Sequence, residues 1–352
     1  MRDVAIVNYR QTPAIRNSGS TNELQMLESV IQGVIAESGV SLSDMDFVCS
    51  GSCDYLAGAA FAFVEAIESV GPFPPIKESH VEMDAAWALY EAVLKIRTGE
   101  ADSALIYGFG KSSPGDLRSV LSLQLDPYYL TPLWLDTISA AALQAAQCLD
   151  RGVLSEDDMA AVVARSRANA KSVPGTQLSG DYSVADLLAE PTYVSPLRMH
   201  DCAPITDGAS VMIIATPEKA KQWCDTPVLI TGLDNRIESS MPTLRDLTVS
   251  SSTEIAGQKA GVNDKTVEFA ELHAPFSHQE ILLQRALGLD DGVDINPSGG
   301  ALAANTMMAA GLDRIGHAAK LIQSGKYARG VAHATSGSCL QHNLVAVLEA
   351  AS

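Results

Sequence analysis

The stretch LKIRTGEADSALIYGFGKSS (residues 94–113) decides the fold, because a related stretch, KLIQSGKYARGVAHATSGS (residues 320–338), returns late in the chain. Each copy runs from the end of a helical pattern through a turn glycine, Gly99 or Gly325, into a short apolar strand. A pattern that recurs in this way indicates a duplicated structural unit.

Two more pairs of matching segments extend this pattern, in the same order and at a nearly constant offset of about 225 residues. VAIVNYRQ (residues 4–11) corresponds to VLITGLDN (residues 228–235), and residues 37–53 correspond to residues 258–274. Three ordered matches favour two fused copies of a βαβαβ unit that share one core. Chance similarity between ordinary helix and strand endings is the alternative.

We therefore expect an N-terminal half over residues 1–220 and a C-terminal half over residues 221–352. Short apolar runs alternate with amphipathic helices such as residues 23–39, which predicts an α/β fold with buried sheets and excludes all-α and all-β folds. Residues 112–197 interrupt the first copy. An excursion of this length is typical of a subdomain or a lid, and we expect it to cover a pocket.

The composition predicts a globular protein with an acidic surface. The chain has 352 residues, 47% of them hydrophobic, and its 42 acidic and 24 basic residues give a net charge of −18. Such a surface repels nucleic acid and anionic membranes, so we expect neither as a partner. The sequence contains no stretch of about 20 apolar residues and its N-terminus reads as a strand, so we expect a cytoplasmic protein without a membrane span.

The six cysteines are dispersed along the chain, which predicts reduced thiols and not a disulfide framework. Only Cys49 and Cys53 lie close together in the sequence, and they lack the second pair and the histidine partner of a zinc site. We expect no metal site and interpret both as small buried residues.

Four segments in order along the chain resemble motifs of one known family. They are PITDGASVMIIAT (residues 204–216), ELHAPFSHQEIL (residues 271–282), INPSGGALA (residues 295–303) and HATSGSCLQHNLVAVLE (residues 333–349). With the duplication, they make the chain similar to the thiolase superfamily, in particular its sterol-carrier-protein-X or lipid-transfer-protein branch. The resemblance implies two βαβαβ halves in a layered α-β-α-β-α arrangement, with an inserted loop domain.

The catalytic positions depart from the thiolase pattern. The family's nucleophilic cysteine falls on Glu82, its second cysteine falls on Pro275, and the histidine of its Gly-His-Pro motif falls on Asn305 or Thr306. Thiolytic chemistry through an acyl-enzyme requires a thiolate, so we expect that chemistry to be absent. Cys339 lies after the loop position where a catalytic cysteine would stand, and we interpret it as a packing residue.

What remains of the family's site is an arrangement that could stabilise an anion. His273 and Asn305 could together hold a thioester enolate, and Glu82 or Asp84 could act as the general base, with His80 a weaker candidate. The alternatives are structural: a hydrogen-bonded histidine at a strand end, an amide that ties a loop, and carboxylates that cap a helix N-terminus.

Substrate-binding residues are predicted with similar alternatives. Tyr128 and Tyr129 would form an apolar wall or part of the core. By the resemblance, the loop domain would bind the phosphates of CoA through a basic patch, unless that patch is a solvated helix face. Backbone N–H groups of two glycine-rich turns would contact the thioester or pantetheine, unless these are only tight turns. The patch is Arg165, Arg167 and Lys171, and the turns are Ser298, Gly299 and Gly300, and Ser336 and Gly337.

The chain looks most similar to cysteine-less steroid side-chain aldolases, which implies retro-aldol cleavage of a bulky β-hydroxyacyl-CoA. No cofactor is expected besides CoA as part of the substrate. One alternative is a non-catalytic subunit that supports a homologous catalytic partner, and its cavity would be filled by Met83, Trp87 and Met307. Another alternative is a thiolase or acyltransferase with an unconventional site.

The resemblance also implies a homo- or heterodimer with a thiolase-like chain, and a small partner made of a zinc ribbon and an oligonucleotide-binding-type barrel.

Overall fold

The fold is built on one mixed sheet of ten strands in the order β10-β9-β11-β12-β8-β1-β7-β4-β2-β3. The computed structural model describes residues 2–71 and 77–351. The strands are β1 (Ala5–Gln11), β2 (Phe47–Gly51), β3 (Lys77–Val81), β4 (Ser103–Gly110), β7 (Gly208–Ala215), β8 (Val228–Ile237), β9 (Phe269–Leu272), β10 (Asp294–Ile295), β11 (Arg329–Ser336) and β12 (His342–Ala350).

The two halves of this sheet have the same strand order. Counted outward from the joint, the first half runs β1, β7, β4, β2, β3, and the second runs β8, β12, β11, β9, β10. In each half the first two pairings are antiparallel and the last two are parallel. Within the sheet, the halves join where Ala5 pairs with Leu229 and Ile6 pairs with Val228. This matching topology confirms the predicted α/β fold with two related βαβαβ units.

Helices form layers around the sheet. The helices α4 (Ala85–Thr98) and α12 (Ala310–Gln323) share one hydrophobic core with strands of both halves, so they form the middle layer. The helix α1 (Glu23–Ser38) packs on the other face of the first half, whereas α10 (Ser251–Ala260) and α11 (Ser277–Leu287) pack on the other face of the second half. The layered arrangement that the resemblance implied is therefore confirmed.

The paired glycines found in the sequence end the paired helices. Gly39 follows α1 with φ 64° and Gly261 follows α10 with φ 77°, while Gly99 follows α4 with φ 84°. Gly325 lies just beyond α12 with φ 75°. Since these left-handed conformations favour glycine, the same helix ending recurs in both units.

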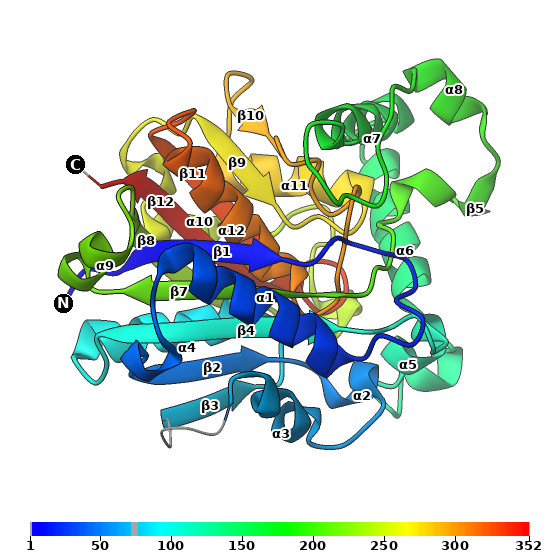
Figure 1. The fold of residues 1–352 in the computed structure, drawn as a ribbon. Helices are drawn as coiled ribbons and strands as arrows, with labels where there is room; N and C mark the ends of the chain where they lie inside the picture. The colour runs from blue at the N-terminus through cyan, green and yellow to red at the C-terminus, as the bar shows by residue number, and fades with distance from the viewer. Residues whose placement is uncertain (1, 72–76, 352) are drawn as a thin grey trace.

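The inserted segment gathers at one end of the sheet (Figure 1). It contains α5 (Leu117–Ser122), α6 (Thr137–Asp150), α7 (Glu156–Ala170), α8 (Val184–Ala189) and a small hairpin, β5 (Thr192–Val194) with β6 (Leu197–Arg198). Three shorter helices lie elsewhere: α2 (Asp54–Ala57), α3 (Ala62–Ala66) and α9 (Pro217–Trp223). In the described ranges, no helix combines the length and apolarity that crossing a membrane requires.

Candidate active site

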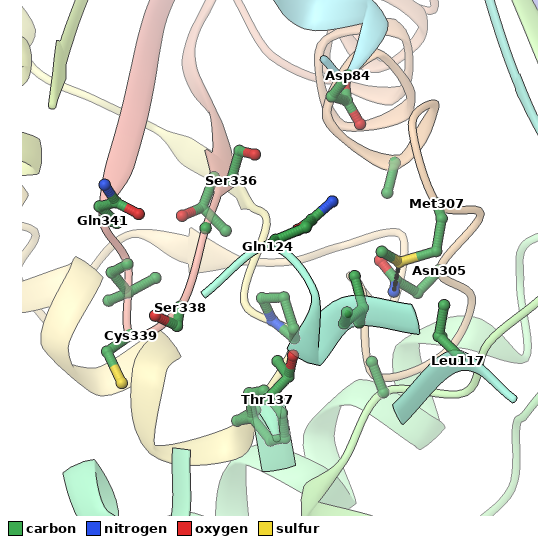
Figure 2. Close-up of a pocket in the computed structure, with 18 of the residues that line it drawn as sticks. Asp84, Leu117, Gln124, Thr137, Asn305, Met307, Ser336, Ser338, Cys339 and Gln341 are labelled. Carbon is green, nitrogen blue, oxygen red and sulfur yellow. Dashed lines mark hydrogen bonds between the residues drawn. The ribbon is translucent and has the colours of Figure 1, made fainter. Parts of the chain in front are cut away.

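A cavity of about 520 Å³ lies where the central helices α4 and α12 begin. Its wall includes six of the residues that the sequence predicted for the site: Glu82, Asp84, His273, Asn305, Ser336 and Gly337. Figure 2 shows Asn305 and Met307 on one side of the cavity, and Ser336, Ser338 and Gln341 on the other. Segments far apart in the sequence therefore converge on one space.

Much of the remaining wall is apolar. The inserted segment contributes Leu117, Leu121 and Leu125 from α5 and the turn after it, and Ile138 from α6. Met83 and Met307 line the cavity without filling it, and Trp87 lies outside it, donating from Nε1 to Nε2 of His342 at 3.1 Å. An apolar, largely preformed space of this size suits a sizeable hydrophobic ligand.

His273 and Asn305 form a directed pair at the end of β9. The backbone N–H of Thr335 donates to Nδ1 of His273 at 3.3 Å, so the ring proton sits on Nε2, which lies 3.1 Å from Oδ1 of Asn305. Burial, with the nearby charges of Arg314 and His333, lowers the pKa of His273 to about 3. The neutral ring thus donates its one N–H to Asn305 and fixes the orientation of that amide.

This orientation leaves the amide nitrogen of Asn305 free for a ligand. Its only recorded contact among the described residues is a weak one, 3.8 Å from Nδ2 to the sulfur of Met307 (Figure 2). Thr306, the other residue that the sequence offered at this position, instead bonds Thr206 through its hydroxyl at 3.0 Å. Asn305 is therefore the one of the two that faces the cavity.

Asp84 joins the two central helices. It is the N-cap of α4, where it accepts from the backbone N–H of Ala86 at 2.9 Å. It also accepts from Gly311 at 2.9 Å and from Leu312 at 3.2 Å, both at the start of α12. Burial raises the pKa of Asp84 to about 6, against the opposing effect of these N–H donors. A carboxylate has about four acceptor positions, so three bonds leave room for a fourth.

No family model matches the chain, but it is similar to several known proteins. An acetyl-CoA acetyltransferase of Methanothermobacter thermautotrophicus is 24% identical over 333 residues, which is 86% of each chain. The 17-hydroxy-3-oxo-4-pregnene-20-carboxyl-CoA lyase of Mycobacterium tuberculosis is 26% identical over 64% of this chain and 61% of its own. Human sterol carrier protein 2 is 24% identical over 86% of this chain and 62% of its own.

The fold of this chain is thiolase-like, and its sequence is similar to proteins of the thiolase superfamily. Its relatives are those of the sterol-carrier-protein and lipid-transfer branch, in which aldolases occur. Among solved structures, the Ltp2-ChsH2(DUF35) aldolase superposes with a TM-score of 0.82 at 20% identity, over 99% of this chain and 98% of its own. Human mitochondrial 3-ketoacyl-CoA thiolase superposes with a TM-score of 0.79 at 15% identity, over 99% of both chains.

The thiols at the cavity of this thiolase-like protein are poor nucleophiles. Cys53, Cys202 and Cys339 line the cavity. Burial raises the pKa of Cys53, raises that of Cys202 to about 12, and raises that of Cys339 to about 11. A thiolase nucleophile needs a pKa moved in the opposite direction. The sulfur of Cys339 also lies 3.4 Å from the carbonyl of Ala140, which fits a packing role.

Glu82 lines the cavity at its more exposed edge. Its carboxylate accepts from the backbone N–H of Asp54 at 2.7 Å and lies 3.3 Å from Nε2 of His80. The Nδ1 atom of His80 in turn contacts the hydroxyl of Ser50 at 3.0 Å. With its side chain half exposed, Glu82 lacks the enclosed setting of Asp84.

The predicted basic patch of the inserted segment does not line the cavity. Arg165 pairs with the buried carboxylate of Glu280, and Arg167 donates to the carbonyl of Leu302. Lys171 pairs with Asp181 at 2.5 Å. Each of these cations thus has an intramolecular partner, two of them in the second half, so they hold α7 against that half.

The other predicted binding residues also lie away from the cavity. Tyr128 and Tyr129 are 81% and 70% exposed, so they are neither part of its wall nor part of the core. The Ser298 hydroxyl donates to Glu271 at 2.6 Å and accepts from Arg314 at 2.8 Å. Gly299 and Gly300 have φ values of 92° and 64° and turn the chain against α7 and Asn296.

Sequence reasoning missed several polar residues of the wall, among them Arg118 and Tyr193. Arg118 donates to Asp136 at 2.7 Å and to the hydroxyl of Tyr193 at 3.2 Å. A signal was present, because Arg118 is the only basic residue between positions 112 and 150. Tyr193 comes from a hairpin that a sequence pattern could not bring to this place.

Proposed function

We propose that this chain catalyses retro-aldol cleavage of a bulky β-hydroxyacyl-CoA, without an acyl-enzyme. The observation that carries the proposal is the pairing, in one open cavity, of an oriented amide donor on Asn305 with an enclosed carboxylate on Asp84 whose pKa burial raises to about 6. Cleavage of this kind needs a base for a hydroxyl proton and a donor for an enolate oxygen.

The chemistry requires no covalent bond to the protein. Asp84 accepts the proton of the β-hydroxyl as the bond between the α- and β-carbons breaks. The oxygen of the hydroxyl becomes the carbonyl of a released ketone or aldehyde. The electron pair moves onto the thioester, whose oxygen becomes an enolate held by the N–H of Asn305, with His273 as the positioning residue. Protonation of the α-carbon then gives the shortened acyl-CoA.

The relatives support this direction. The mycobacterial relative is a lyase whose name includes a steroid carboxyl-CoA, and one superposable structure is an aldolase. From these relatives we infer that the substrate of this chain is hydrophobic and of steroid-like bulk, because the wall contributed by α5 and α6 is apolar. The open cavity argues against the alternative of a degenerate supporting subunit, in which Met83 and Met307 would occupy that space.

We also propose that the chain works with a small protein of the DUF35 type, since the superposable aldolase is a complex with such a partner. The raised pKa of the cavity thiols supports lysis over acyl transfer.

The experiment is incubation of the purified chain, alone and with a DUF35-type partner, with β-hydroxyacyl-CoAs of increasing acyl size. Mass spectrometry should find a ketone or aldehyde together with the shortened acyl-CoA, and an unchanged protein mass. A protein carrying an acyl group would contradict the proposal and support the thiolase reading. Turnover that is unchanged when Asn305 and Asp84 are both replaced would place the chemistry elsewhere.

A further inference from the structure

Arg118 is the one arginine or lysine among the residues that line the cavity in the described ranges. The acidic residues of the same wall are Glu82, Asp84 and Asp126, and the whole chain carries a net charge of −18. A CoA thioester brings several phosphate charges to this surface, so its binding requires a local cation that offsets the general repulsion.

The guanidinium of Arg118 is held along one edge. Its Nη2 atom donates to Oδ2 of Asp136 at 2.7 Å, and Asp136 is the N-cap of α6, where it accepts from Ile138 and Ser139. Although partial burial raises the pKa of Asp136, the hydrogen bonds from Arg118 and Ser139 lower it to about 2. This carboxylate therefore stays ionised and orients the arginine.

Tyr193 adds a second donor beside the guanidinium. Nη1 of Arg118 donates to the Tyr193 hydroxyl at 3.2 Å, which uses the phenol oxygen as an acceptor and leaves its own proton free to donate. The side chain of Arg118 is 44% exposed and Tyr193 is 41% exposed, so a ligand can reach both. A guanidinium has five N–H groups, and these two contacts use two of them.

We propose that Arg118 and Tyr193 form an anion-binding site on the cavity wall that holds a phosphate group of a CoA thioester. The identity of this ligand rests on the proposed function. An acyl group that ends in a carboxylate would offer the same chemistry to the same donors, so the test must separate the two sources. Arg165, Arg167 and Lys171, for which this role was predicted, do not line the cavity, whereas Arg118 does.

The test measures binding by calorimetry and needs no turnover, so it is independent of whether cleavage occurs. The probes are CoA, dephospho-CoA, pantetheine, butyryl-pantetheine and succinyl-pantetheine. The variants are Arg118→Gln and Tyr193→Phe, with Lys171→Gln as the control that removes one positive charge from the inserted segment. Thermal melts confirm folding, and Tyr193→Phe keeps the contact between Arg118 and Asp136 intact.

We expect Arg118→Gln to weaken CoA binding about tenfold and Tyr193→Phe about threefold, while pantetheine binding is unchanged. Lys171→Gln should stay within about twofold of the wild type. If Arg118→Gln weakens the binding of succinyl-pantetheine but leaves the binding of butyryl-pantetheine and CoA unchanged, the phosphate assignment is overturned in favour of an acyl carboxylate. Equal binding of every probe by wild type and both variants would overturn the site itself.

Discussion

Asn305 offers an oriented amide donor for an enolate beside Asp84. Replacing it with alanine should lower kcat/KM for cleavage by about 10²- to 10³-fold, because a donor to a developing oxyanion is lost from an enclosed site. Thr306→Val is the matched control: it removes a hydroxyl that bonds Thr206 away from the cavity, and turnover should change less than about threefold. Similar losses in both variants would mean that the loop, and not the amide, matters.

Asp84 should give the pH dependence of the reaction. A general base must be deprotonated, and the pKa of Asp84 is about 6, so kcat/KM should fall as the pH drops below about 6 and reach a plateau above it. Asp84→Asn keeps an acceptor for the helix N–H groups but cannot take a proton, so it should lower the plateau by about 10²- to 10⁴-fold.

The control for this profile is Glu82→Gln, the other carboxylate that the sequence offered. Its profile should keep the same acidic limb, because Glu82 lies at the exposed edge of the cavity. If the acidic limb of the pH profile survives in Asp84→Asn but disappears in Glu82→Gln, then Glu82 and not Asp84 is the general base.

The sequence motifs located some residues of the site correctly and missed others. His273 directly follows β9 and Asp84 is the N-cap of α4, so a motif that fixes the element also fixes the residue, and Asn305 lies in the loop that the glycine-rich motif enters. Arg167 could not be placed this way, because a pattern of cations on a helix does not say which of them turns inward to meet a carbonyl. Arg118 and Tyr193 meet only after the inserted segment has folded.

At the scale of the element, the glycines of β4 let the two halves meet. A Cβ at Gly108 would lie 2.7 Å from the carbonyl oxygen of Met308, and one at Gly110 would lie 2.2 Å from that of Met307. The carbonyl of Met308 also accepts from the N–H of Ala85 at the start of α4. The absent side chains thus allow the loop that carries Asn305 to approach the first half.

Gly110→Ala should therefore displace this loop. We expect a loss of about 1–3 kcal/mol in the free energy of unfolding, together with lower turnover, since the clash is with backbone and not with a flexible side chain. Gly115→Ala, where the nearest atom is the carbonyl oxygen of Ser112 at 3.9 Å from the new Cβ, is the control and should leave both unchanged. Denaturant titration and a cleavage assay on the two variants provide the comparison.

At the scale of the whole molecule, the sequence predicted the duplication but not how its copies interlock. Equivalent glycines and strands could be matched in the sequence because each belongs to one local unit. The contacts between units are non-local: β1 pairs with β8, Asp84 caps α12, and Tyr9 donates to Asp313 at 2.6 Å. Trp223, just past the expected boundary at residue 220, packs on the core around α1, and so does Leu229 of β8.

This interlocking predicts that the two halves unfold together. Of the three tryptophans of the chain, Trp223 packs on the core of the first half and Trp134 is largely exposed, whereas Trp87 lies in the core that the halves share. Fluorescence therefore reports on the first half and the shared core, and far-ultraviolet circular dichroism reports on both halves. Because α4 and α12 share one core, the two probes should give coincident denaturant transitions.

Tyr9→Phe removes one donor to the buried Asp313 between the halves and should lower the free energy of unfolding by about 1–3 kcal/mol. Both transitions should then shift by the same amount, whereas a shift in fluorescence alone would mean that each half is stable without the other.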